Sequence, residues 1–357
     1  MKAGVTGNNV DMKRIHLYLI AITAALVSGC YDDYELDYDY DAIYTAYQYD
    51  LRTFVMGEKQ GFDFTVALGG VVSNNRDRSI EVYLDNTLLA SDLSKFSESG
   101  DAEPFTAIDA FKGKASFGFV SQPYVTEQVD AAGITSFEIL PATYYNIEGL
   151  RNMTIAKGRH TATATISAND VIATDPKALA PYYALGFRIE SADADIVLPE
   201  MSFEIIAIKC ENKHFGYWYY EGERHIVDET SGNSISITTY TADTNQPDAL
   251  SCYLTTRGFN SLVANKVGGE DGRIILTIAE DNTISVSSPD ASTIVETIDG
   301  EPSYTNDATL LQNREIHLNY RFSNGDGTAT VVKDVLRFKY RVRDGVLEYQ
   351  DENPENY

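Results

Sequence analysis

The sequence predicts an all-β protein with an N-terminal Ig-like antiparallel β-sandwich and a C-terminal antiparallel β domain, built as a second sandwich or as a barrel-like meander. Three observations support this prediction. Apolar and polar residues alternate over many short segments, clusters of Gly, Asn, Asp and Pro separate these segments, and few stretches have helical spacing. A chain of 357 residues is long enough for two domains that each bury a core.

The first domain is assigned to residues 44–210 because strand periodicity dominates there. Apolar residues take every second position in the segments 62–68, 80–84, 162–166 and 203–207. This period is expected for antiparallel strands that have one face in water. The best helix-compatible stretch, 168–183, is interrupted by Pro176 and Pro181, so we expect little helix.

The second domain is assigned to residues 211–350, and it closes with the clearest hairpin in the chain. Alternating apolar residues at 316–322 and 336–342 flank the turn 324–327, where two glycines and Asn/Asp tolerate positive φ. A stripe of basic residues on the returning strand is predicted to face outward: Arg337, Lys339, Arg341 and Arg343. Such a stripe is typical of a solvated face that pairs with acidic side chains, and binding of anionic sugars is the alternative.

The N-terminus has the features of a signal peptide spanning residues 1–29, with Met12 as the better start. Lys13 and Arg14 precede an apolar segment, 17–27, that is short for a transmembrane helix. The segment ends in Leu-Val-Ser-Gly-Cys, which resembles the bacterial lipobox. We therefore expect the thiol of Cys30 to be acylated and to anchor the protein in outer-membrane lipid.

An acidic tether, residues 30–43, follows the predicted lipid anchor. Like charges extend such a segment in solution. Asp32, Asp33 and Glu35, directly behind Cys30, resemble the surface-export signal of Bacteroidota lipoproteins. This resemblance implies an outer-membrane protein that faces the extracellular medium, and a generic acidic linker facing the periplasm is the alternative.

Charge and cysteine content narrow the range of partners. The formal net charge of −25 and the acidic tail at 351–357 disfavour nucleic acid, since phosphate backbones would be repelled. Cys210 and Cys252 form either a disulfide or two unpaired core thiols. Neither they nor the histidines have the spacing of a zinc site, so we expect no metal and no cofactor.

No catalytic motif is present in the sequence. A GxSxG elbow, HExxH, a phosphate-binding glycine loop and β/α repeats are all absent. Although 53 acidic residues make chance carboxylate pairs unavoidable, none has a recognisable catalytic context. We therefore expect a protein that is not an enzyme.

The densest aromatic cluster is the run Tyr217, Trp218, Tyr219 and Tyr220, and it is the candidate glycan-binding site. Sugars bind through their C–H faces to flat aromatic rings, with polar groups for the hydroxyls. Alternate residues of a strand point to opposite faces, so one pair should pack inward while the other is exposed. Core packing of Trp218 is the alternative.

Several landmarks resemble a family of Bacteroidota surface lipoproteins. These landmarks lie at 54–58, 67–71, 74–82, 140–145, 155–158 and 175–189. Members carry an uncharacterised N-terminal β-sandwich domain that also precedes the catalytic barrel of some endo-β-N-acetylglucosaminidases. The segment 340–346 resembles a second uncharacterised β domain that is often appended to the first.

The resemblance implies a non-catalytic protein that binds glycans as an accessory to a polysaccharide-uptake system, beside an outer-membrane transporter complex. It supplies no binding residues that match positions in this chain. A protein-binding adhesin, or a structural subunit of a cell-surface complex, is the second reading. An unrecognised hydrolase, or an accessory to a glycoside hydrolase, is the third.

Overall fold

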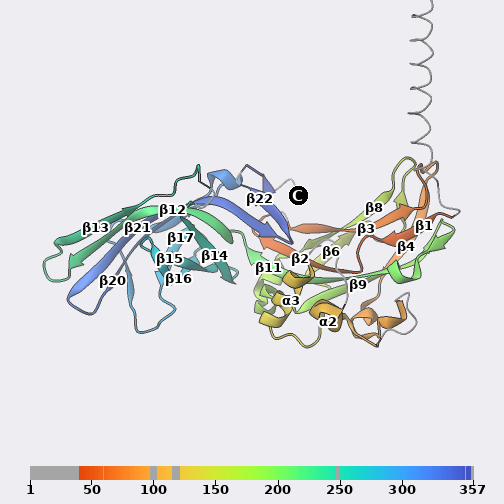
Figure 1. The fold of residues 1–357 in the computed structure, drawn as a ribbon, viewed down its shortest axis with the longest axis horizontal. Coiled ribbons are helices and arrows are strands. Elements are labelled where there is room, and N and C mark those ends of the chain that lie inside the picture. Colours follow the sequence, from red (N-terminus) through yellow and green to blue (C-terminus); the bar gives the residue numbers. More distant parts are fainter. Residues whose placement is uncertain are drawn as a thin grey trace, which may run out of the picture.

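The computed structural model describes residues 40–354 except 59, 97–102, 115–120, 247–248 and 350. The predicted signal peptide, Cys30, Asp32, Asp33 and Glu35 lie outside the described residues. The described chain consists mainly of strands in antiparallel sheets, which confirms the all-β prediction. Figure 1 shows two parts side by side, a sandwich in orange to light green and a barrel in green to blue.

The N-terminal domain is a sandwich of two sheets. The first has the order β10 (Ile196–Val197), β1 (Ala42–Thr45), β3 (Gly61–Gly69), β8 (Thr161–Ala168) and β6 (Tyr145–Glu148). The second has the order β2 (Tyr49–Met56), β11 (Phe203–Asn212), β9 (Tyr183–Ala192), β4 (Arg78–Leu84) and β7 (Met153–Ile155), with β5 (Glu138–Ile139) beside β9. The chain crosses between sheets after β1, and β2 then runs parallel to β11. β1 begins inside the stretch assigned to the tether.

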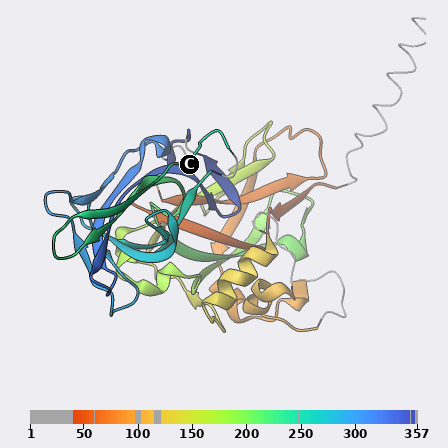
Figure 2. The same ribbon diagram turned by 60° about the vertical axis from the view of Figure 1, so that its left-hand side comes forward.

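Apolar side chains on the facing strands form the sandwich core. Phe54 of β2 and Ile206 of β11 pack against Phe64 of β3 and Ile166 of β8. The outer face of the second sheet is covered by the segment that contains α2 (Ala107–Asp109) and α3 (Gln122–Ala131), as Figure 2 shows. Burial on both faces explains why β11 is apolar along most of its length.

The structure has little helix, as expected, but its longest described helix lies outside the stretch that the sequence favours. The stretch 168–183 forms only the short 3₁₀ turns Asp170–Thr174 and Pro176–Leu179, because its two prolines prevent a longer helix. The one helix of ten residues among those described is α3, where Pro123 lies in the first turn and Val125 and Val129 are buried. None of the described helices has the length and apolar character needed to cross a bilayer.

The C-terminal domain is a closed antiparallel meander, so of the two predicted forms it adopts the barrel. Pairing between neighbours, together with the pairing of β12 with β21, closes a ring of eight strands. In order they are β12 (Gly216–Asp228), β14 (Ser251–Gly258), β15 (Ser261–Val267), β16 (Glu270–Ile278), β17 (Thr283–Ser287), β19 (Ser303–Asn306), β20 (Glu315–Ser323) and β21 (Thr328–Arg343). The flanking strands are β13 (Ser234–Tyr240), β18 (Val295–Thr297) and β22 (Val346–Tyr349).

The predicted hairpin is formed by β20 and β21. Gly325 and Gly327 in its turn have φ of +78° and +88°. Inside the barrel, Asp334 of β21 accepts hydrogen bonds from the hydroxyls of Tyr220, at 2.7 Å, and Tyr240. Burial raises the pKa of Asp334 to about 7, because desolvation of the carboxyl outweighs the opposite effect of its hydrogen bonds.

The two domains are packed against each other through ion pairs and apolar contacts. Glu58, after β2, accepts hydrogen bonds from Arg314 Nη1 and Arg341 Nη2, both at 2.6 Å. Val55 of β2 belongs to the apolar cluster of the barrel. The connection is so close at Gly216, whose φ is +124°, that a Cβ there would lie 2.6 Å from Arg341 Cβ. The barrel therefore continues directly from the sandwich without a flexible linker between β11 and β12.

Candidate functional site

The structure separates the aromatic run 217–220 into two faces, as strand alternation requires. Trp218 and Tyr220 point into the barrel core and are 0% and 1% exposed, so the expectation that they bind glycan is wrong. Trp218 Nε1 donates to the His214 carbonyl oxygen at 3.0 Å, which satisfies its polar atom inside the core. Tyr217 and Tyr219 lie on the outer face, where Tyr217 is 36% exposed.

Tyr217 is part of a row of four tyrosines, which we call the tyrosine row. Strand register places Tyr253, Tyr217, Tyr340 and Tyr349 beside one another on β14, β12, β21 and β22. The ring of Tyr217 lies 4.5 Å from that of Tyr253 and 4.7 Å from that of Tyr340. Neighbouring rings one strand spacing apart must stand on edge, so they cover each other's faces. The row presents ring edges to solvent at Tyr217, rather than the flat face that a sugar would need.

The basic stripe is interrupted by a bulge. Tyr217 pairs with Tyr340 and Trp218 pairs with Phe338, so Lys339 is an extra residue on β21. This insertion reverses the faces beyond it, and Arg341 becomes fully buried instead of facing outward. The prediction that all four basic residues face solvent is therefore wrong for Arg341, and also for Arg343, whose side chain is only 14% exposed. Arg337 does pair across strands with Glu221 and Glu315, at 2.7 and 3.2 Å.

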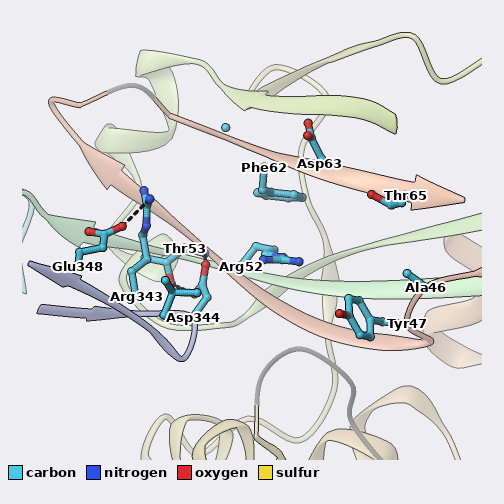
Figure 3. Close-up of a pocket in the computed structure, with 12 residues that line it drawn as sticks. Ala46, Tyr47, Arg52, Thr53, Phe62, Asp63, Thr65, Arg343, Asp344 and Glu348 are labelled. Carbon is cyan, nitrogen blue, oxygen red and sulfur yellow. Dashed lines mark hydrogen bonds and ion pairs between the residues drawn. The ribbon is translucent and has the colours of Figure 1, made fainter. Parts of the chain in front are cut away.

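A pocket of about 410 Å³ lies where the two domains meet, and we call it the junction pocket. Its lining comes from the crossing between β1 and β2, from β3 and from the β21–β22 hairpin of the barrel. Figure 3 shows Arg52 and Phe62 facing each other, with Tyr47 on one side and Arg343, Asp344 and Glu348 on the other. Two aromatic rings thus share a concave wall with polar groups, at a domain boundary where ligands commonly bind.

Phe62 and Tyr47 supply the apolar part of the junction pocket. The Phe62 ring stacks on Phe54 of the sandwich core, with ring centroids 5.3 Å apart. That contact holds one face of the ring while the side chain stays partly exposed at the pocket. Tyr47 lies in the crossing between sheets and is half-buried. The two rings thus reach the pocket from different parts of the chain, Phe62 from β3 and Tyr47 from the crossing.

The arginines of the junction pocket are held by buried carboxylates. Arg52 Nε lies 2.6 Å from Asp50 Oδ2, and Arg343 Nη2 lies 2.5 Å from Glu348 Oε1. Arg341 Nε holds the other oxygen of Glu348. Each cation at the pocket is thus already matched by an anion that other groups keep in position.

Three buried acids in and around the junction pocket have pKa values above their ordinary range. Burial raises the pKa of Asp50 to about 6 and that of Glu204 well above the usual glutamate value. Burial also raises the pKa of Asp344, although its carboxylate accepts from the Thr53 backbone N–H at 2.9 Å and the Thr53 hydroxyl at 2.6 Å. Asp50 and Asp344 are held in the pocket wall by their contacts with Arg52 and Thr53.

Two further depressions lie on single domains. One, of about 710 Å³, opens on the sandwich beside Tyr83, Tyr145 and Arg151. The other, of about 540 Å³, lies on the barrel wall beside His317 and Lys333. Since the junction pocket is the one of these three cavities that both domains build, we take it as the candidate site.

The sequence left the state of two cysteines open and predicted no metal site. Cys210 and Cys252 are both free and buried, one in the sandwich core and one in the barrel core, so the alternative of two unpaired thiols is confirmed. Within the ranges that the structure describes, no group of three or more His, Cys, Asp or Glu side chains is placed to hold a metal ion.

The sequence patterns do not predict the junction pocket, because its residues are spread along the chain from Ala46 to Glu348. The one available signal was Arg343, which the basic stripe included. Nothing in the sequence pattern indicates that β22 folds back towards β2.

Comparison with solved structures finds similar chains from Bacteroides species. A protein of unknown function from Bacteroides ovatus is 17% identical with a TM-score of 0.55, over 89% of this chain and 98% of that chain. A multidomain protein including DUF1735 from Bacteroides ovatus is 10% identical over 86% and 97% of the two chains, with a TM-score of 0.38. An auxiliary nutrient binding protein from Bacteroides thetaiotaomicron is 11% identical over 84% and 92%, with a TM-score of 0.37. Of these three, the first shows a shared fold. No family model and no curated protein matches the chain.

Proposed function

We propose that this protein is a lipid-anchored, surface-exposed glycan-binding protein that assists polysaccharide uptake and does not cleave its ligand. The proposed location at the cell surface rests on the lipobox that ends at Cys30 and on the acidic residues that follow it, Asp32, Asp33 and Glu35. An anchor of this kind holds the folded domains where polymers arrive from the medium.

The observation that supports glycan binding is the combination of groups in the junction pocket. Phe62 and Tyr47 offer apolar ring surface, while Arg52, Thr65 and Arg343 line the same cavity with hydrogen-bonding groups. Sugars present both C–H faces and hydroxyls, so they need this mixture. A cavity of about 410 Å³ lies within the ordinary range for small-molecule sites. We place the glycan in this pocket rather than at the aromatic run.

Calorimetry on the full chain, purified in detergent, tests this proposal. The chain is titrated with neutral and acidic polysaccharides, and binding to at least one of them is expected. Tyr47→Ala should weaken that binding about tenfold or less, since one aromatic contact is worth about 0.5–1.5 kcal/mol. The melting temperature of Tyr47→Ala is measured alongside, so that weaker binding can be distinguished from a loss of folding.

Tyr83→Ala is the matched control, because Tyr83 is a half-buried tyrosine beside a different depression. It should leave glycan affinity unchanged. Loss of binding in Tyr83→Ala with full binding in Tyr47→Ala would move the site to the sandwich depression. No binding by the wild type would refute glycan recognition.

The anchor is tested separately. Labelled palmitate should enter the wild type and not Cys30→Ser. Replacing Asp32, Asp33 and Glu35 by Ala should keep the label but protect the protein from protease added to intact cells. Equal labelling of the wild type and Cys30→Ser would contradict lipidation at this residue.

Protein binding is the second candidate function, and an apolar surface next to the tyrosine row favours it. Tyr217, Val342, Leu347 and Tyr349 are each 36–50% exposed and lie on the outer face of neighbouring strands. Tyrosine is enriched in protein interfaces, and stacked ring edges beside aliphatic side chains suit a protein better than a sugar. If Leu347→Asp abolished assembly into a cell-surface complex while glycan binding persisted, this function would also hold.

A further inference from the structure

The charges around the junction pocket indicate which class of glycan it accepts, and this inference rests on the proposed function. Arg52 and Arg343 are the two cations that line the pocket among the described residues. Their side chains are 16% and 14% exposed, and the carboxylates that pair with them are 0% and 3% exposed. Both guanidiniums are thus largely withdrawn from solvent into internal ion pairs.

The partner carboxylates are fixed by additional hydrogen bonds. The Leu51 backbone N–H donates to Asp50 Oδ1 at 2.9 Å, and Arg341 holds the second oxygen of Glu348. Asp344, beside Arg343 in the pocket wall, is fixed through both oxygens by Thr53. These acids cannot swing aside to release an arginine without losing bonds of their own.

An anionic sugar would have to compete with these carboxylates. Breaking a buried ion pair is strongly unfavourable because it leaves a desolvated charge without a partner. The pocket also contains Asp63, Asp344 and Glu348, and the chain as a whole has a formal net charge of −25, so an approaching carboxylate or sulfate is repelled.

A neutral sugar meets no such penalty. A guanidinium has five N–H donors and a carboxylate about four acceptor positions, so a paired group still hydrogen-bonds to a hydroxyl without giving up its partner. From this arrangement we infer that the junction pocket selects neutral glycans and rejects uronic acids and sulfated sugars.

The test compares neutral and acidic polysaccharides on the detergent-purified full chain. Neutral polymers should bind with an affinity that changes little between low and high salt. Polymers of uronic acid and sulfated polymers should bind at least tenfold more weakly. Preferential binding of an acidic polymer, lost at high salt, would overturn the inference and leave the proposed function standing. If neither neutral nor acidic polysaccharides bind, the proposed function itself is refuted.

A double variant, Asp50→Asn with Glu204→Gln, replaces the carboxylate paired with Arg52 and the buried carboxyl group beside it, and so tests whether this pairing causes the selection. Burial raises the pKa of both acids, so neutral amides of the same shape suit their positions. The variant should gain at least tenfold in affinity for uronic-acid polymers and keep its affinity for neutral ones.

Asp85→Asn is the matched control. It frees Arg188, whose Nε lies 2.7 Å from Asp85 Oδ2, at a place outside the junction pocket. This control should show no gain in affinity for uronic-acid polymers. An equal gain in both variants would show that net charge alone governs the selection, which would overturn the role of the Arg52 pair.

Discussion

The junction pocket and the tyrosine row both contain exposed aromatic rings, yet they differ in what those rings offer. In the pocket, Phe62 has one face held by Phe54 while the ring remains partly exposed beside hydrogen-bonding groups. In the row, Tyr217 has Tyr253 on one side and Tyr340 on the other. The denser aromatic cluster is therefore the poorer sugar platform, because stacking covers the surface that a sugar ring would contact.

The difference arises from register. Tyrosines at paired positions of adjacent strands lie about 4.8 Å apart, which brings their rings face to face. The two pocket aromatics come from a strand and from a crossing between sheets, so their rings do not stack on each other. The sequence shows local density of aromatic residues but does not show which strands become neighbours.

The largest expected effect is on stability, for Trp218→Ala. Trp218 is fully buried in the barrel cluster and its ring packs edge-on to Phe338 with centroids 5.4 Å apart. Removing it should lower the free energy of unfolding by about 3–5 kcal/mol. Guanidinium denaturation measures this change. A loss below about 1 kcal/mol would mean that the ring is not core, and the assignment of faces in the run 217–220 would fail.

The next effect concerns the pH dependence of stability that comes from Asp334 inside the barrel. Burial raises the pKa of Asp334 to about 7 in the folded state, from an ordinary value of 3.8. The folded protein thus binds this proton more tightly than the unfolded chain does. The stabilisation is complete below the unfolded pKa and is lost as the pH rises through about 7, by up to about 4 kcal/mol.

Asp334→Asn removes this titration, so its stability should fall less than that of the wild type between pH 5 and pH 8. Urea denaturation of both proteins at the two values measures the difference. The buried acids near the junction pocket titrate in both proteins and cancel in the comparison. Parallel pH dependences would show that Asp334 keeps an ordinary pKa.

The smallest effect is expected for Tyr217→Ala on the tyrosine row. Loss of two ring contacts on a partly exposed surface should cost about 1–2 kcal/mol of stability. Glycan affinity should stay within about twofold of the wild type, as measured by calorimetry with the polymer that the wild type binds. A tenfold loss of glycan affinity would contradict the comparison and would indicate that the sugar binds at the aromatic run.

Much of the fold follows from the sequence, since alternation and turn residues are local signals. The hairpin around Gly325 and Gly327 forms as predicted, and the split of Tyr217 from Trp218 onto opposite faces follows from strand geometry. Closure of the barrel depends on the pairing of β12 with β21, which joins segments more than a hundred residues apart. No local pattern shows that pairing.

The errors have physical causes that act beyond one strand. Arg341 is buried because the extra residue Lys339 shifts the faces of β21, and a bulge of this kind leaves no mark in the apolar alternation. The α3 helix was missed although Val125 and Val129 have helical spacing, since one such pair in ten residues is a weak signal. The junction pocket depends on how two domains meet, and this arrangement is fixed by tertiary ion pairs such as Glu58 with Arg341.

Hydrogen–deuterium exchange of the full chain, with and without the polysaccharide that it binds, tests the junction pocket most directly. The account predicts slower exchange for peptides covering residues 46–53 and 61–65, which line the pocket, and unchanged exchange for β14 beneath Tyr253. Tyr47→Ala should abolish most of that protection while Tyr217→Ala leaves it intact. Protection confined to β14 and to 217–219, with no change at 46–53, would contradict the account.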